Sequence, residues 1–269
     1  MPEASIDHLR DEWRSIAALC DSLDADEWAR PTACPGWTIK DQLSHLVAPE
    51  AAMLGRPAPP KLTEHPIYVH NAVGEMNEDA VELRRSWSGK EVLAEFKEVT
   101  SARLDALYKM SDAELDSDSW TPVGPGRYRD LLAIRAFDAW VHGQDIRDAL
   151  GRLGDLDTPA AAHALQRCFL AMPYVIGKKV GPPEGSSVAL EVIGPTSGHL
   201  AVEIKEGKAR LAESDLLAPT ASISVDFVIY TRVACGRLAP AEALGAEGIS
   251  IKGDKRLGEA VIENLNFMI

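Results

Sequence analysis

Apolar residues recur every three or four positions through most of the first 150 residues, which is the spacing of amphipathic helices. Turn residues such as Pro57, Pro59 and Gly124 separate these segments. The pattern predicts an N-terminal region that is helical throughout, with four long segments and one long crossover, as in a four-helix bundle. The segments expected to be helical are residues 5–23, a helix beginning at Thr38, residues 66–85, 88–108 and 128–150, and a short turn at 111–114.

The pattern changes after about residue 155. Apolar and polar residues then alternate over short stretches, which is typical of half-buried strands, and segments with helical spacing lie between them. We therefore predict two domains, residues 1–155 and 156–269, the second a small α+β domain with a mainly antiparallel sheet. Strands are expected at 187–193, 199–205, 209–212, 220–225 and 249–251, and helices at 163–175, 227–238 and 257–265.

Charge and hydropathy exclude several classes of protein. The formal net charge is -13, and no long basic run is present, whereas binding to duplex nucleic acid needs a cluster of Lys and Arg. No apolar run is long enough to cross a bilayer. The first residues have neither the basic region nor the apolar core of a signal peptide. We expect a cytoplasmic protein that binds neither nucleic acid nor membrane, either a monomer or a homodimer.

The four cysteines are far apart and form no CxxC motif. This spacing does not resemble a disulfide framework, and we interpret all four as reduced thiols. Cys20 falls on the apolar stripe of its predicted helix, which favours a core position for it. The other three are Cys34, Cys168 and Cys235.

The predicted helix at 128–150 carries the most specific candidate chemistry. Asp138, His142 and Asp145 are spaced i, i+4 and i+7, so they stack on one helix face. A carboxylate and an imidazole one turn apart can both reach a single divalent ion. The alternative is an Asp–His pair half buried at the rim of the helix.

A second candidate lies on the helix that begins at Thr38. Its main apolar stripe includes Ile39 and Leu43, and His45 falls on another face, beside Asp41 and small alanines. Small neighbours leave room for a ligand to approach His45. From periodicity alone, a histidine that faces solvent is the better interpretation.

Three stretches of the chain resemble the mycothiol-dependent maleylpyruvate isomerase family, a branch of the DinB-like four-helix bundles. Residues 35–46, PGWTIKDQLSHL, are similar to its N-terminal motif, and residues 137–147, FDAWVHGQDIR, to its second motif. Residues 253–268, GDKRLGEAVIENLNFM, resemble the end of its C-terminal domain, which is similar to sterol-carrier-protein-2 (SCP2) folds. The resemblance spans nearly the whole chain, and it specifies the superfamily better than it specifies a reaction.

The resemblance implies a divalent metal, zinc in the isomerase, held by His45, Asp138 and His142. The isomerase has Glu at the position of Asp138, which is one methylene shorter. Position 143 is often Glu in relatives and is Gly here. Because glycine within a helix is unfavourable by roughly 1 kcal/mol relative to Ala, Gly143 indicates either a close approach of another element or a widened pocket.

The function implied is that of a metal-dependent enzyme that uses mycothiol as co-substrate, an isomerase or a thiol S-transferase acting on a small electrophile. Three protein ligands leave one position of the metal open, as in catalytic zinc sites. Asp145 is a candidate for a residue that holds a ring nitrogen of a ligand histidine, and pairing with Arg147 is equally compatible with its position. Arg237 is a candidate for binding a substrate carboxylate, and the alternative is an ordinary surface arginine.

Two other classes of function remain open. One is a small-molecule or lipid carrier with a structural metal and an apolar cavity in the second domain, with which Phe227, Val228 and Ile229 are compatible. The other is a metal-dependent hydrolase that needs no thiol. Co-purifying lipid would favour the carrier, and activity without any thiol would identify the hydrolase.

Overall fold

The computed structural model describes residues 3–214 and 216–268. The chain divides into two compact units, one formed by the residues up to Asp155 and one by Leu156–Met268. The first is helix-rich and the second contains a sheet with mostly antiparallel strands, so the predicted fold class is confirmed.

The first unit is built around four helices that pack side by side, with a fifth helix, α4, against α3. Their buried faces form one apolar cluster that includes Trp13, Ile16, Leu43 and Leu46, as the helical spacing predicted. Phe137 and Val141 are buried as well. The helices are α1 (Ala4–Cys20), α3 (Ile39–Met53), α4 (Ala72–Glu82), α5 (Gly89–Leu107) and α7 (Tyr128–Leu150), with short α2 (Ala25–Trp28) and α6 (Asp112–Leu115).

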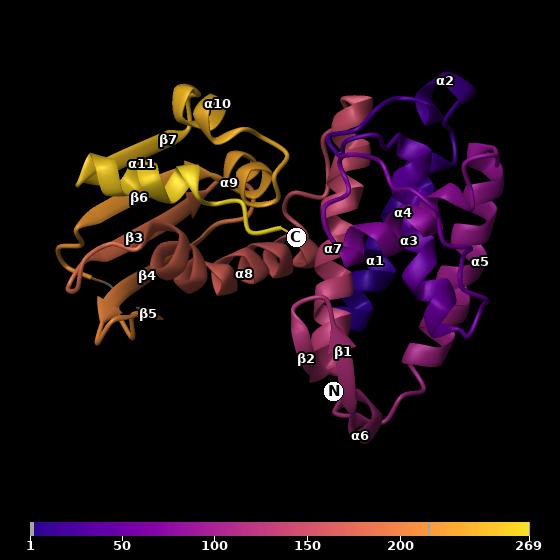
Figure 1. The fold of residues 1–269 in the computed structure, drawn as a ribbon, viewed down its shortest axis with the longest axis horizontal. Helices are drawn as coiled ribbons and strands as arrows, with labels where there is room; N and C mark the ends of the chain where they lie inside the picture. Colours follow the sequence, from indigo (N-terminus) through magenta and orange to yellow (C-terminus); the bar gives the residue numbers. More distant parts are fainter. Residues whose placement is uncertain (1–2, 215, 269) are drawn as a thin grey trace. The chain divides into compact units, whose positions relative to one another are not determined.

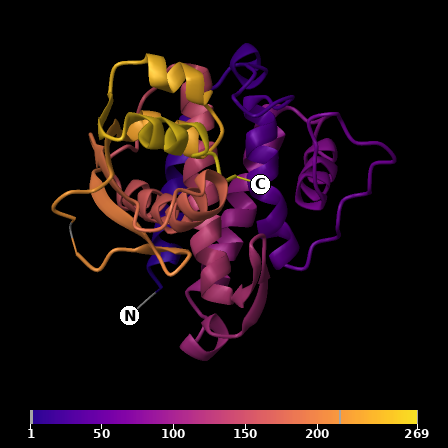
Figure 2. The ribbon, with the colours of Figure 1, turned by 60° about the vertical axis from the view of Figure 1, so that its left-hand side comes forward.

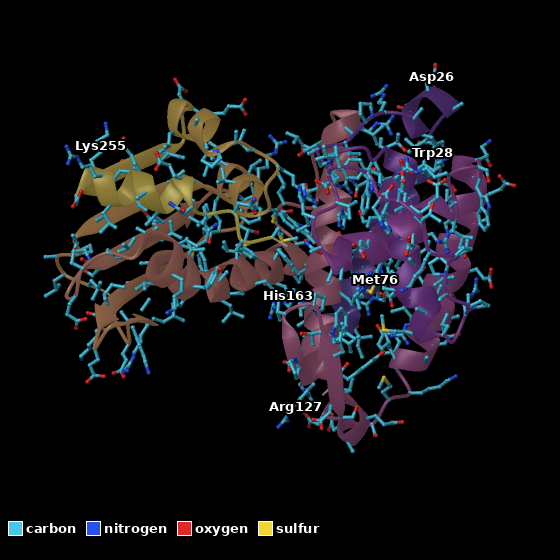
Figure 3. All side chains as sticks on the ribbon, viewed as in Figure 1. Asp26, Trp28, Met76, Arg127, His163 and Lys255 are labelled. Atoms are coloured by element: carbon cyan, nitrogen blue, oxygen red, sulfur yellow. The ribbon has the colours of Figure 1, made fainter. Side chains whose placement is uncertain are left out.

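Local hydrogen bonds determine where these helices begin. Thr38 accepts from the backbone N–H of Asp41, and the Asp41 carboxylate accepts from the N–H of Thr38, which is a capping box. Ser88 and Glu91 form the same arrangement at α5. Gly151 ends α7 in the left-handed conformation that glycine tolerates best. Figure 3 labels Trp28, the last residue of α2, and Arg127, the residue directly before α7.

Two predictions for this unit are wrong. The structure has an antiparallel hairpin, β1 (Asp118–Thr121) and β2 (Gly124–Arg127), so the region is not helical throughout. The hairpin packs against α7 (Figures 1 and 2). The helix expected from residue 66 begins only at Ala72, where the Asn71 side chain caps it by accepting from the N–H of Gly74. The segment before it is held by Asp79 and Glu78 of α4, which accept from Leu62 N–H and the Tyr68 hydroxyl.

The second unit has a five-stranded sheet in the order β5-β4-β3-β6-β7, in which β3 and β6 are parallel and the other pairs antiparallel. Alternate residues of β3 and β6 are buried. This agrees with the alternation of apolar and polar residues from which the strands were predicted. The helix expected at 227–238 ends at Ala234. The strands are β3 (Ser187–Ile193), β4 (Gly198–Lys205), β5 (Lys208–Leu211), β6 (Ala221–Asp226) and β7 (Ile249–Gly253); the helices are α8 (Pro159–Tyr174), η1 (Val175–Val180), α9 (Phe227–Ala234), α10 (Pro240–Gly245) and α11 (Lys255–Glu263).

Candidate functional site

The three residues expected to bind metal lie together between α3 and α7. Their ligand atoms are all within 4.8 Å of one another. The Nε2 atom of His45 is 3.2 Å from Oδ2 of Asp138, and Nε2 of His142 is 3.5 Å from Oδ1 of the same carboxylate. The two imidazole rings meet edge to face, with 4.6 Å between their centroids. Two nitrogens and a carboxylate thus converge on one point, which is the donor set of many zinc sites.

The interpretation of His45 as a solvent-facing residue is wrong. Its exposed fraction is only 5%. Trp37, at the start of the same segment, lies with its ring centroid 5.2 Å from that of His45 and 6.1 Å from that of His142. Its indole N–H donates to Glu78, at 2.9 Å, which fixes the ring against the cluster. Trp37 therefore forms an apolar wall on one side of the site.

Burial and charge set the protonation of the cluster. Burial alone would raise the pKa of Asp138, but Arg135 and the two imidazoles outweigh it and hold that pKa well below its usual value. Burial lowers the pKa of His45, and Asp138 offsets this only in part. Asp138 is therefore an anion and His45 a neutral imidazole at pH 7, which are the forms that bind a divalent ion.

Asp145 lies on the far side of His142 from Asp138. Its Oδ2 atom is 3.0 Å from Nδ1 of His142. Burial lowers the pKa of His142, but Asp138 and Asp145 outweigh burial and hold the pKa well above its usual value. A carboxylate at Nδ1 keeps the proton on that nitrogen and leaves Nε2 to face the cluster. Arg147, the other partner considered for Asp145, pairs with Asp155.

Three residues near the cluster were not predicted as site residues. The Cys34 thiol donates to Asp145 Oδ2 at 3.4 Å, so Cys34, His142 and Asp145 form a second group with metal-ligand chemistry. Arg135 donates to Asp138, and Glu50 accepts from Arg135. Of these contacts, only the one between Arg135 and Asp138 could have been predicted from the sequence, because residues spaced i, i+3 on a helix lie side by side. Cys34 and Glu50 come from other segments.

Arg237 lies in the second unit, beyond the end of α9 rather than within it. Its Nη1 atom donates to the carbonyl of Cys235 at 2.6 Å. This contact places Arg237 at a helix C-terminus, where cations are favoured. Binding of a substrate carboxylate by Arg237 stays a prediction.

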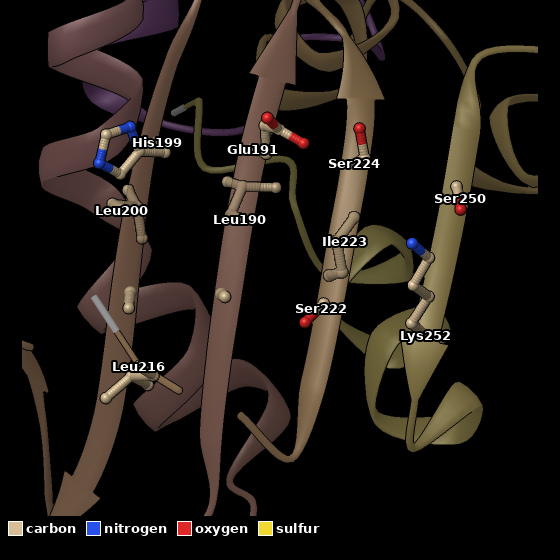
Figure 4. Close-up of a pocket in the computed structure, with 12 residues that line it drawn as sticks. Leu190, Glu191, His199, Leu200, Leu216, Ser222, Ile223, Ser224, Ser250 and Lys252 are labelled. Carbon is tan, nitrogen blue, oxygen red and sulfur yellow. The ribbon is translucent and has the colours of Figure 1, made fainter. Parts of the chain in front are cut away.

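The open face of the second unit's sheet has a depression with a volume of about 430 Å³. Small side chains form its floor, and Glu191, His199 and Lys252 stand at its edges (Figure 4). The register places His199 opposite Glu191 and Glu191 opposite Ser224, so acidic, basic and hydroxyl groups alternate across the strands. Charged and hydroxyl groups line it together with alanines and leucines, and the small-molecule or lipid carrier stays an alternative.

A helical bundle with histidines and a carboxylate on facing helices defines a class of candidate metal-binding proteins. Residues 9–147, just over half of the chain, match the family model of the mycothiol maleylpyruvate isomerase N-terminal domain. The chain belongs to this family. No helix among the described residues is long and apolar enough to cross a membrane.

Two relatives are uncharacterized proteins of Mycobacterium tuberculosis, from strains CDC 1551 / Oshkosh and H37Rv. Each is 30% identical over 158 residues, which is 56% of this chain and 58% of theirs. The match therefore spans little more than half the length of these curated relatives.

Two solved structures are similar over almost the full length. One is the mycothiol-dependent maleylpyruvate isomerase, with a TM-score of 0.56, and the other is a His-to-Ala mutant of it, with a TM-score of 0.55. Both are 16% identical to this chain, and the match covers 94% of this chain and 93% of theirs. At that identity the likeness shows the fold, a helix-rich part followed by a sheet domain. The SCP2-like character of the second unit stays a prediction.

Proposed function

We propose that this protein is a mycothiol-dependent enzyme, an isomerase or a thiol S-transferase that acts on a small electrophile. The observation that carries the proposal is the convergence of His45, Asp138 and His142, from the two motifs of the family, on one buried point. The donor set fits a divalent ion, for which zinc is the best candidate. Asp138 and His45 are already in the forms that bind metal, whereas the raised pKa of His142 means that the ion would displace a proton from its Nε2. Bound there, such an ion favours the thiolate form of a thiol near neutral pH.

The chain's own residues have separate roles in this proposal. His45, Asp138 and His142 would hold the ion, and Asp145 keeps the proton of His142 on Nδ1. Trp37 excludes water from one side. In the reaction a thiol adds to an electrophilic carbon of the substrate. Loss of the thiol after rotation gives an isomer, and its retention gives a transfer product.

Metal analysis tests the site. Wild-type protein, metallated and then desalted, should contain one zinc per chain, and His142→Ala should contain none while remaining helical by circular dichroism. His65→Ala is the matched control, because His65 also pairs with an aspartate, Asp79, at 2.9 Å but belongs to no candidate metal group among the described residues. Equal zinc contents in the wild type and His142→Ala would overturn the site.

Product analysis tests the reaction. Wild-type protein incubated with mycothiol and a panel of small electrophiles, maleylpyruvate included, should give isomers or mycothiol adducts detectable by mass spectrometry. The turnover should require both the thiol and His142. Turnover of the same substrates without thiol would instead identify a hydrolase.

A further inference from the structure

A chain of buried ion pairs runs from the candidate metal site into the bundle. Glu50 on α3 has an exposed fraction of 0%. One of its oxygens accepts from Nε of Arg103 at 3.1 Å, and the other accepts from Nε of Arg135 at 2.9 Å. Arg135 continues the chain with a bond from Nη1 to Oδ2 of Asp138 at 2.6 Å. The two arginines balance the two carboxylates, so no net charge is buried.

Arg135 is the only member of this chain of ion pairs, among the described residues, that contacts both Glu50 and the site. Its guanidinium is a planar fork, so two charge-assisted bonds at different nitrogens fix both its position and its orientation. Because Glu50 is fully buried on α3, its bond to Arg135 Nε holds one side of the fork in place. Arg135 therefore anchors the carboxylate to α3 as well as to its own helix.

The two oxygens of Asp138 have different partners. Oδ2 faces both Arg135 Nη1 and His45 Nε2, whereas Oδ1 faces Nε2 of His142. A strong bond from Arg135 opposes rotation of the carboxylate and draws electron density toward Oδ2. The carboxylate is thus presented in one orientation instead of closing over an ion with both oxygens.

We propose that Arg135 is a positioning residue of the metal site, which holds Asp138 in the orientation that binds the ion through one oxygen. This inference rests on the proposed metal site. Loss of a residue that orients a metal ligand typically lowers metal affinity by about 10–100-fold. The same loss is expected for Arg135→Met.

Arg103→Met is the matched control. Arg103 and Arg135 are both buried and both bond to Glu50 through Nε, but Arg103 does not contact Asp138 in the structure. Zinc affinity, measured by competition with a chromophoric chelator, should fall about 10–100-fold in Arg135→Met and change less than about threefold in Arg103→Met. Equal affinities in the two variants would overturn the inference while leaving the metal site intact. A wild type without zinc affinity would overturn the proposed function instead.

Cobalt substitution gives a readout that a merely structural role would not change. The visible bands of Co²⁺ weaken when the coordination number rises from four to five. They should weaken in Arg135→Met, because the freed carboxylate can bind with both oxygens, and stay unchanged in Arg103→Met. If Arg135→Met does not fold, Arg135→Lys keeps the charge but loses the fork, and it should still weaken the bands. Wild-type band intensity in the folded variant would contradict the proposal.

Discussion

At the level of single residues, Glu12 and Ile16 of α1 pack against Gly143 beside the site. Glu12 on α1 is 3% exposed, and its Oε2 atom lies 3.4 Å from where a Cβ on Gly143 would be. Ile16 contacts the same point at 3.4 Å. Of the two interpretations of Gly143, close approach of another element is the one the structure supports. A long side chain at position 143 would run into α1.

Glu12 should make folding stability depend on pH. Burial, together with the charge of Asp155, raises the pKa of Glu12 to about 8 from 4.5. Below pH 4.5 both folded and unfolded chains hold the proton. Between pH 4.5 and 8 only the unfolded chain releases it, so the free energy of unfolding falls by up to about 1.4 kcal/mol per pH unit. Glu12→Gln removes this effect and should therefore be more stabilising at pH 8 than at pH 5, by roughly 3–5 kcal/mol.

Urea denaturation of both proteins across this pH range measures the difference. Glu91→Gln is the control, because hydrogen bonds from Ser88 lower the pKa of Glu91. Its stabilising contribution is lost as the pH falls, so the control should show the opposite trend. A Glu12→Gln curve parallel to that of the wild type would mean that Glu12 is ionised in the folded protein.

Some contacts of single residues in the site could be predicted from the sequence, and others could not. The stacking of Asp138 and His142 follows from the helical repeat alone and was predicted. The burial of His45 was missed, because it depends on the packing of α3 against α7, which periodicity within one helix does not show. The contacts of Cys34 and Glu50 depend on pairings more than 80 residues apart in sequence. Local spacing carries no information on such contacts.

At the level of elements, the start of α3 determines where His45 lies. The Thr38 hydroxyl caps the helix, and Asp41 closes the capping box. Later in the same helix, Pro49 has no N–H to donate to the carbonyl of His45, four residues earlier. The first turn and its cap therefore contribute strongly to the stability of the segment that carries His45.

Thr38→Ala should lower the free energy of unfolding of the first unit by about 1 kcal/mol, within a range of roughly 0.5–2 kcal/mol for caps of this kind. Thr38→Ser keeps the hydroxyl and should change stability much less. Denaturation followed by tryptophan fluorescence compares the variants. Equal losses in Ala and Ser would show that the methyl group, rather than the cap, stabilises α3.

Elements with strong local signals were predicted well, and those without them were not. The predicted ranges 88–108 and 128–150 agree with α5 and α7 to within a residue, where Ser88 and Glu91 begin α5 and Gly151 ends α7. The hairpin at 118–127 was missed, because two glycines and a proline in β2 are typical of loops. Its strands form because they pair with each other and pack against α7, which is a tertiary effect.

At the level of the whole molecule, the proposed metal ligands all lie in one of the two units. All three proposed metal ligands come from α3 and α7, within the residues that match the family model. The sheet of the second unit contributes none of them. Metal binding should therefore stabilise the molecule unevenly.

Hydrogen exchange monitored by mass spectrometry tests this unevenness. An ion that binds only the closed cluster suppresses local opening, and at a hundredfold excess over the dissociation constant the stabilisation is about 2.7 kcal/mol. Zinc should therefore slow exchange about a hundredfold in peptides from α3 and α7 that open together with the cluster, and leave β3 unchanged. In His142→Ala the slowing should disappear. Equal slowing in β3 would show instead that zinc stabilises both units, and a single cluster on two helices would no longer explain its binding.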